Sequence, residues 1–422
     1  MKGPAKTRAT LSCLLISCLL QAQLPPPHAT KSAMNFSKVI GWKDGETPQA
    51  PEGFTVTRFA HNFQNPRWMY QLPNGDILVV ESNTPHSWLE KLGAAVIGAN
   101  KSNDMRNSAN RITLLRDTTA DGIPDLRTSF LEGLNLPFGL LLIKDKLYVA
   151  NTDAVLVFDY TDGQTLINSV GKKIIDLPAG KVNQHWTRNL LANSDQSKIY
   201  IAIGSGTNVA EKGLDLEKDK ARIWEINPDG TGLKVYASGL RNPVGMGWEP
   251  STGTLWVTVN ERDKLGDELV PDYLTSVKEG GFYGWPYSYF GQHYDPRVKE
   301  EEQDSALVAS ALVPDIPLGA HTASLGLVFY THTAFPEKYQ GGAFVAQHGS
   351  WNRSKLSGYR VVFIPFKNGK AAKAPEDFLT GFIVDPDKDE VRGRPTGLLL
   401  LKDGSLLLTD DTSDTIWRIA AK

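Results

Sequence analysis

Short apolar runs alternate with turn-forming residues along most of the chain, and six stretches repeat the same arrangement. Each has an apolar strand, a turn rich in Asn, Asp, Gly or Pro, and a second strand rich in β-branched and aromatic residues, which is the pattern of a β-hairpin. The six stretches cover residues 70–82, 139–160, 189–205, 245–261, 326–350 and 397–419. Four of them are followed by further alternating segments, such as "ARIWEIN" and "GYRVVFIPF".

The spacing of these hairpins predicts the fold. Repeats separated by roughly 50 to 90 residues, with three or four strands each, are typical of propeller blades, because radial repetition leaves few open sheet edges. We therefore predict an all-β protein, a six-bladed β-propeller over residues 50–422. One or two β-sandwiches would account for the strands but not for their period.

Composition indicates a globular protein and argues against nucleic acid as a partner. Of 422 residues, 41% are hydrophobic and 22% are charged, with a net charge of -2. This is the profile of an ordinary globular chain with an ample core. Because the chain is not basic, nothing indicates a nucleic-acid-binding protein.

The N-terminus has the pattern of an export signal. Lys2, Lys6 and Arg8 precede the apolar stretch "LSCLLISCLL" and a proline-rich segment. That order is typical of a secretory signal, and the apolar stretch is too short to span a bilayer. We expect a signal peptide over residues 1–22, a linker over 23–49, and a periplasmic or extracellular mature protein with no transmembrane segment.

Both cysteines of the chain, Cys13 and Cys18, lie in this signal. A cleaved protein therefore has no disulfide. Cleavage near Ala22 is one interpretation. "LISC" also resembles a lipoprotein cleavage box, which would make Cys18 the lipidated first residue.

Polar residues stand just before the first strand of each repeat. In a propeller that strand lines the central channel, so the preceding segments meet at one end of the axis. The polar residues that they bring together are Arg67, Asn135, His185, Arg188, Arg241, Asn242, His321, Arg392 and Arg394. Converging guanidiniums match carboxylate or phosphate oxygens two at a time, which predicts an anionic ligand. The alternative is that these segments only form turns between blades.

His185 is the expected acid–base residue of this set. A histidine titrates near neutral pH and can take a proton from a substrate hydroxyl within hydrogen-bond reach. His321 and His348 are the other histidines near predicted axial ends.

Two loops carry acidic residues in patterns that suit calcium. Asp263, Asp267 and Glu268 stand on a loop followed by permissive glycines, which favours a hard, oxygen-liganded cation. A solvated acidic loop is the alternative. The second loop, 117–125, has Thr128 where a calcium loop would close with Glu, so we expect a turn there.

Several motifs together resemble one family. "GLRNPVGMGWEP", "GDEL" and "GGFYGWP", with "QHWTR" upstream and "GRP" near the C-terminus, are similar to the soluble pyrroloquinoline quinone (PQQ) dependent glucose/sorbosone dehydrogenases. "SANRITLLRD" and "QHGSWNRSKLSGYRVVFIPF" resemble the L-sorbosone dehydrogenase-like branch. The similarity runs from about residue 50 to the C-terminus. It implies a six-bladed propeller that oxidises a sugar or sugar aldehyde and passes electrons to an external acceptor, a cytochrome or quinone.

The resemblance also implies roles for individual residues. His185 matches the general base, Arg241 the arginine beside the reactive quinone carbonyl, and Asn242 its neighbouring cofactor contact. Arg392 and Arg394 match an arginine pair that binds cofactor carboxylates.

Calcium is implied at two places. One ion would bridge the quinone to the backbone carbonyls of Arg262 and Asp263, and a second, structural ion would use Asp267 and Glu268.

The chain departs from the glucose enzymes at three points. The calcium loop has Arg262-Asp263 in place of Gly-Pro, and Asn352 or Arg353 stands where those enzymes have a cofactor lysine. The segment 83–110 has no counterpart in them, and we expect it to shape the substrate entrance. Two other functions remain open: a calcium-dependent propeller lactonase or hydrolase, and a non-catalytic carbohydrate-binding propeller.

Overall fold

The structure is a computed structural model that describes residues 24–422, except 85, 87–89, 92, 95–97 and 103–104. The predicted signal peptide, with Cys13 and Cys18, therefore lies outside the described residues, and export stays a prediction. No helix in the part of the chain that is described is long and apolar enough to cross a membrane.

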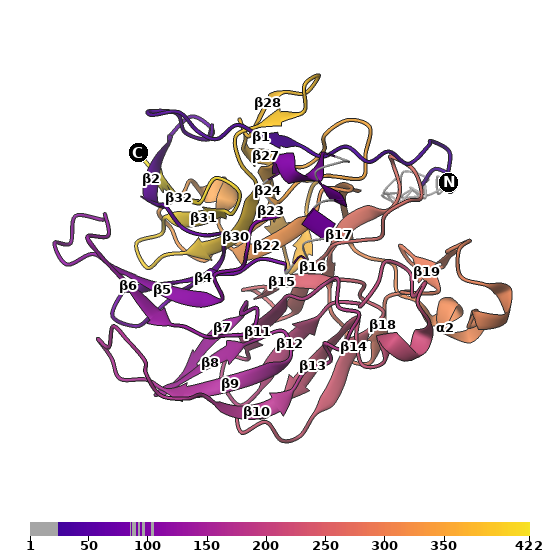
Figure 1. Ribbon diagram of the computed structural model, residues 1–422, viewed down its shortest axis with the longest axis horizontal. Helices are drawn as coiled ribbons and strands as arrows, with labels where there is room; N and C mark the ends of the chain where they lie inside the picture. Colours follow the sequence, from indigo (N-terminus) through magenta and orange to yellow (C-terminus); the bar gives the residue numbers. More distant parts are fainter. Residues whose placement is uncertain (1–23, 85, 87–89, 92, 95–97, 103–104) are drawn as a thin grey trace, which may run out of the picture.

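Six antiparallel sheets surround a common centre, which confirms the predicted six-bladed propeller (Figure 1). The first blade comprises β3 (Pro66–Gln71), β4 (Ile77–Glu81), β5 (Arg111–Arg116) and β6 (Leu126–Leu131). The second comprises β7 (Leu140–Ile143), β8 (Lys146–Ala150), β9 (Ala154–Asp159) and β10 (Lys172–Asp176). The third comprises β11 (Arg188–Ala192), β12 (Ile199–Ile203), β13 (Arg222–Ile226) and β14 (Lys234–Ser238), extended by the parallel β18 (Gly281–Phe282).

The other three blades complete the ring. The fourth comprises β15 (Pro243–Trp248), β16 (Leu255–Val259), β17 (Pro271–Ser276) and β21 (Ile316–Ala320). The fifth comprises β22 (Ser324–Phe329), β23 (Ala343–Gln347), β24 (Arg360–Ile364) and β27 (Glu376–Leu379). The sixth comprises β30 (Pro395–Leu400), β31 (Leu406–Asp410) and β32 (Thr415–Ala421), and its outer strand is β2 (Phe54–His61). Because β2 pairs with the C-terminal β32, the two ends of the propeller are joined in one sheet.

A recurring glycine lets the inner strands approach one another around the axis. A Cβ on Gly139 would lie 2.5 Å from the backbone nitrogen of Leu190 in the next blade. A Cβ on Gly245 would lie 2.5 Å from the carbonyl oxygen of Leu325. Gly326 and Gly397 meet the following inner strand in the same way. A side chain at these positions would force neighbouring blades apart, which explains the glycine near the start of four repeats.

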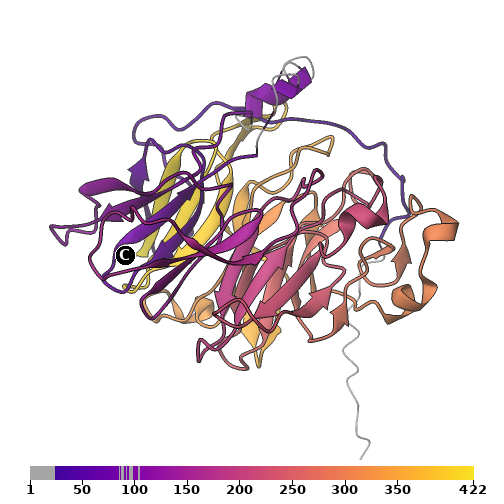
Figure 2. The same ribbon diagram turned by 60° about the horizontal axis from the view of Figure 1, so that its bottom comes forward.

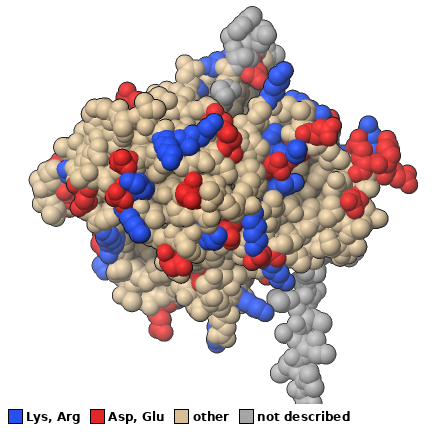
Figure 3. Space-filling model, turned by 90° about the horizontal axis from the view of Figure 1, so that it is seen from below, with Lys and Arg blue, Asp and Glu red and all other residues tan. Residues whose placement is uncertain are grey.

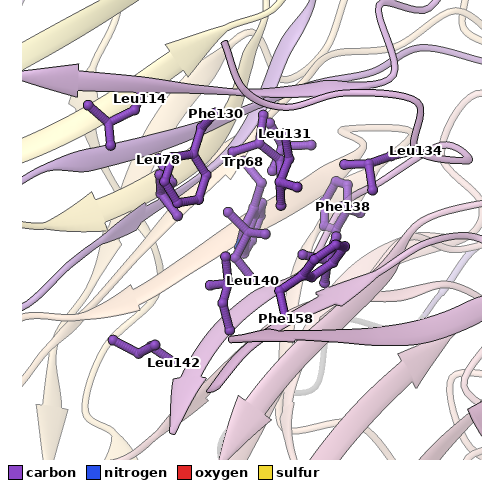
Figure 4. Packing of buried hydrophobic residues seen from close by; sticks show 14 of the residues in the cluster. Trp68, Leu78, Leu114, Phe130, Leu131, Leu134, Phe138, Leu140, Leu142 and Phe158 are labelled. Carbon is purple, nitrogen blue, oxygen red and sulfur yellow. The ribbon is translucent and has the colours of Figure 1, made fainter. Parts of the chain in front are cut away.

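The hydrophobic core is divided into layers between neighbouring blades. Six clusters of buried apolar residues each join two adjacent blades. Figure 4 shows the layer between the first and second blades, where Trp68 and Phe130 lie beside Phe138 and Leu140. The Trp68 and Phe138 rings are 4.8 Å apart. Burial of these large rings makes each layer a major source of stability.

Shorter elements decorate the propeller. They are β1 (Lys38–Val39) with β29 (Glu390–Val391) and β28 (Ile383–Asp385); β19 (Ser288–Tyr289) with β20 (His293–Tyr294); β25 (Phe366–Lys367) with β26 (Lys370–Ala371); helix α2 (Ser305–Ser310); and the 3-10 turns Ala99–Ser102, Leu214–Glu217, Glu300–Glu302 and Glu337–Tyr339.

The segment expected to be a linker is packed along the propeller. Figures 1 and 2 show residues before β2, in indigo, running across one side of the molecule. Trp42 anchors this segment: its ring packs edge-on against Trp417 at 5.0 Å, and its Nε1 donates to Asp410 at 2.9 Å. On the face seen in Figure 3, basic and acidic side chains are interspersed, in agreement with the small net charge.

Candidate functional site

A cavity of about 540 Å³ collects side chains from the ends of the inner strands. Of the residues expected to converge, Arg67, His185, Arg241, Asn242 and Arg394 line it. They come from the first, third, fourth and sixth blades: Arg67 is the second residue of β3, and the others stand just before β11, β15 and β30. The predicted convergence is thus present for these five side chains.

The other expected residues lie outside this lining. Asn135 is exposed. Arg188 is fully buried and donates to the carbonyls of His185 (2.7 Å) and Pro178 (2.9 Å). Burial lowers the pKa of Arg188 to about 9. Arg188 therefore fixes the turn that carries His185.

His321 lies behind the lining as a support. Its Nδ1 is 3.4 Å from Asp263 Oδ1, and its Nε2 lies 2.8 Å from the Gly266 carbonyl. Burial opposes a charge on the ring, but the Asp263 carboxylate beside it raises the pKa of His321.

The tautomer of His185 is fixed by its neighbours. Its Nδ1 lies 3.0 Å from the Ser205 carbonyl and 2.9 Å from Ser205 Oγ. The carbonyl only accepts, and Ser205 Oγ donates its own proton to the Thr207 carbonyl at 2.6 Å. Nδ1 must therefore carry the hydrogen, and the lone pair is on Nε2.

His185 is also held neutral. Burial first, and the nearby positive charge of Arg241 second, lower its pKa to about 3. A neutral imidazole with a free Nε2 lone pair in a polar cavity is suited to accept a proton. Gly204 allows this approach, because a Cβ there would lie 2.5 Å from both His185 Cβ and Asn242 Oδ1.

Arg241 is buried and fully engaged by the loop after β16. Its Nη1 donates to the carbonyls of Asn260 (3.1 Å) and Glu261 (2.7 Å). Its Nη2 donates to Asn208 Oδ1 at 2.9 Å and lies 3.3 Å from Asp263 Oδ2. Arg241 therefore acts on the cavity through its fixed positive charge.

A second histidine faces the cavity from the fifth blade. His348 Nε2 lies 2.9 Å from Asp411 Oδ1, and Arg67 Nη1 pairs with the other carboxylate oxygen. Burial alone would raise the pKa of Asp411, but His348 and Arg67 hold it well below its usual range. The Arg67 guanidinium also lies 5.6 Å from the Trp186 ring centroid. The result is a fixed Arg–Asp–His arrangement on the cavity wall.

The structure separates the arginine pair that was expected to act together. Arg394 lines the cavity and donates to the His348 carbonyl at 3.0 Å and the Gly349 carbonyl at 2.9 Å. Arg392 lies outside the lining, where Glu46 of the N-terminal segment binds its Nε at 2.9 Å. A cofactor-binding role for Arg392 does not agree with this geometry, because its guanidinium is taken by Glu46 and stacks over Trp42 at 5.4 Å.

The expected lysine substitutes also lie outside the main cavity. Asn352 is buried, accepts from the Lys264 backbone nitrogen at 2.7 Å and donates to the Ala33 carbonyl at 2.7 Å. Arg353 pairs with Glu268. Among the described residues, the lysine of the cavity lining is instead Lys264, which is exposed.

The residues expected to hold calcium have other partners. Arg262 is fully buried, and its guanidinium binds Glu261 at 2.9 Å and Asp295 at 3.2 Å. Asp267 accepts from the backbone nitrogen and hydroxyl of Ser354. Within the described residues, no group of three or more His, Cys, Asp or Glu side chains is placed to hold a metal ion. In this structure Asp267 and Glu268 are engaged by Ser354 and Arg353, and a structural calcium at this pair stays a prediction.

Sequence reasoning missed the residues at the ends of the second strands. Because the first two strands of a blade are antiparallel, the start of one and the end of the next meet at the same axial end. Asn260 and Asp411 follow second strands, as does Ser205, which orients His185. His348 also follows a second strand, and it is the one residue of this set that the sequence placed near an axial end. A polar residue recurs at this point in each repeat, and that signal would have found them. Thr84 and His86, from the segment 83–110, also reach the lining.

The fold matches that of the six-bladed propellers represented by the soluble glucose dehydrogenases. Within that class, the chain belongs to the family described as a domain of unknown function, DUF7133, which matches residues 46–351. Residues 285–422 match a second family, described as TrAA12-like.

Two relatives in sequence bear on this assignment. An uncharacterized protein of Borreliella burgdorferi is 31% identical over 299 residues, which cover 68% of this chain and 76% of the relative. The aldose sugar dehydrogenase YliI of Escherichia coli is 26% identical over 263 residues, covering 58% of this chain and 62% of the enzyme.

Two solved structures share the fold at 18% identity. A calcium structure of a Trichoderma reesei family AA12 protein has a TM-score of 0.72, with 89% of this chain and 97% of that chain covered. The holo form of the pyranose dehydrogenase PQQ domain of Coprinopsis cinerea has a TM-score of 0.69, covering 91% of this chain and all, 100%, of that domain.

Proposed function

We propose that the protein is a PQQ-dependent dehydrogenase of an aldose or a sugar aldehyde such as a sorbosone-like substrate. The observation that carries the proposal is His185, a neutral imidazole with its lone pair on Nε2 in a cavity lined by three guanidiniums. The family resemblance and the sugar dehydrogenases among the relatives support the same activity.

The chemistry of the cavity residues suits the quinone. PQQ is a flat aromatic molecule with three carboxylates. Arg67, Arg394 and Lys264 are positively charged residues of the lining, and Trp186 and Trp351 supply aromatic surface. Arginine forks match carboxylates well, and a flat ring gains from aromatic contact. These groups would hold the quinone, with Asn242 as a further contact.

The chain's own residues prepare one proton transfer. Ser205 keeps the imidazole proton on Nδ1, so Nε2 of His185 is ready to accept the proton of the sugar hydroxyl. Arg241 supplies a fixed positive charge near the place where negative charge develops. Bound PQQ would supply the two-electron acceptor for the hydride that leaves the same sugar carbon. Binding in a cavity brings the hydroxyl and Nε2 together without a further entropic cost at the moment of reaction.

The two alternative functions are less well supported by the lining. A metal-dependent lactonase needs several carboxylates directed at one ion. The carboxylates of this lining, Glu211 and Asp263, already accept hydrogen bonds from Val209 N at 2.8 Å and Arg241 Nη2 at 3.3 Å. A carbohydrate-binding propeller would not require the fixed tautomer of His185.

Purified protein tests the proposal directly. PQQ is titrated by calorimetry, and dye reduction is then followed with a panel of aldoses and sugar aldehydes. We expect stoichiometric quinone binding and sugar-dependent turnover. His185→Gln should lose about two to four orders of magnitude in turnover, the usual contribution of a general base, with little change in quinone affinity.

The exposed His61 gives a matched control, because His61→Gln removes an imidazole that is not part of the lining. That variant should retain full turnover. No quinone binding, or undiminished turnover of His185→Gln, would reject the proposal. The external electron acceptor and the expected export of the protein also remain part of this proposal.

A further inference from the structure

The loop after β16 presents its backbone carbonyls to guanidinium groups. Arg241 Nη1 donates to the carbonyl of Asn260 at 3.1 Å and to that of Glu261 at 2.7 Å. Arg297 Nη1 donates to the carbonyl of Asp263 at 2.6 Å. Carbonyl oxygens are among the ligands that calcium prefers, and positive side chains already bind these three.

The Asp263 carbonyl has no lone pair left for an ion. Besides Arg297, Asn208 Nδ2 donates to the same oxygen at 3.0 Å. A carbonyl oxygen offers two lone pairs, so these two hydrogen bonds use both. The Asp263 side chain is also engaged, between Arg241 and His321.

Arg297 is held firmly in this position. Its Nε and Nη2 bind the two oxygens of Asp295 at 2.9 and 2.7 Å, a bidentate pair. Burial would raise the pKa of Asp295, but Arg297 and Arg262 hold it at about 2, so the carboxylate stays ionised. Arg262 binds the same carboxylate from the buried side at 3.2 Å. A dication at the Asp263 carbonyl would have to displace the Arg297 guanidinium, which Asp295 holds in place.

We infer that this protein binds its cofactor without a calcium ion on the loop Arg262–Asp263, and that Arg297 takes the place of that ion at the Asp263 carbonyl while Arg241 binds the neighbouring carbonyls. The inference rests on the proposed function for the identity of the cofactor. It differs from the calcium site that the family resemblance implies. The substitution keeps positive charge beside the cavity while removing the dependence on a metal.

Calorimetric titration of PQQ into the intact protein tests the inference in two buffers, one with millimolar calcium and one with excess EGTA. We expect dissociation constants that agree within about threefold, which is less than 1 kcal/mol. Tightening by calcium beyond that factor overturns the inference. Absence of quinone binding in both buffers rejects the proposed function instead.

Crystals grown in millimolar calcium test the loop whether or not the quinone binds. We expect the Arg297–Asp263 contact to persist, with no ion bonded to the Asp263 carbonyl oxygen. An ion about 2.4 Å from that oxygen, the normal calcium–oxygen distance, would overturn the inference.

Discussion

His185 should remain neutral in the ligand-free protein throughout the range from about pH 8 to about pH 5. Its pKa is lowered from 6.5 to about 3 by burial first and by Arg241 second. At 1.36 kcal/mol per pKa unit, this corresponds to roughly 5 kcal/mol against the imidazolium. At pH 5, about one His185 side chain in a hundred would then be charged.

Proton–nitrogen correlation spectra of protein labelled with ¹⁵N-histidine measure this directly. The signal of His185 is identified by its loss in His185→Gln, and free histidine, which titrates near 6.5, serves as the internal reference. We expect a neutral ring with its proton on Nδ1 and a chemical shift that is constant across the range. A midpoint near 6.5, or a proton on Nε2, would refute the role of Ser205 and the assignment of the base.

The same pKa shift has a consequence for stability. The folded-state pKa lies below the unfolded value, so the group stabilises the fold above pH 6.5, and this contribution is lost as the pH falls toward 3. Between about pH 7.5 and pH 4, wild type should lose about 3 kcal/mol more unfolding free energy than His185→Gln. Urea unfolding of both proteins at the two pH values measures the difference, and equal losses would contradict the shift.

Two further predictions concern the arginine pair and the N-terminal segment. Arg394→Ala should weaken quinone binding by about 1.5 to 3 kcal/mol, the scale of a charge-assisted hydrogen bond, whereas Arg392→Ala should leave it unchanged; equal effects in calorimetric titrations would contradict the separation of the two arginines. Trp42→Phe should lower the unfolding free energy by about 1 to 3 kcal/mol, because the buried Asp410 loses the Nε1 donor at 2.9 Å. Thermal or urea unfolding measures this loss, and an unchanged stability would mean that the N-terminal anchor contributes little.

The fold was predictable because its signal is local and repeated. Each hairpin shows its own alternation and turn residues, and the recurring glycine marks the same place in four blades. The closure of the ring was less accessible. The strand β2 has an ordinary strand pattern, but its partner β32 lies at the far end of the chain. No local feature of the sequence indicates that these two strands pair.

Sequence predicted a site residue correctly only where its position in the repeat determines whether its side chain reaches the cavity. His185, Arg241 and Asn242 stand at equivalent places before inner strands and reach the cavity. Arg392 shares a motif with Arg394, yet its backbone nitrogen bonds the Phe382 carbonyl at 2.7 Å in the outer β28–β29 hairpin. Its partner Glu46 is 346 residues away in sequence, so the pairing depends on how the N-terminal segment crosses the propeller.

The charges of the cavity explain how His185, which has no carboxylate at Nδ1, would act as the base of the proposed reaction. Burial lowers the pKa of His348, and the Asp411 carboxylate at its Nε2 opposes that shift, whereas His185 has a carbonyl and a hydroxyl at Nδ1. Positive charge from Arg241 then disfavours a second proton on the ring. In the proposed function, the same charge would attract the anionic quinone, whose carboxylates would partly neutralise it when bound. Quinone binding should therefore raise the proton affinity of Nε2. One set of guanidiniums would then both bind the quinone and adjust the proposed base.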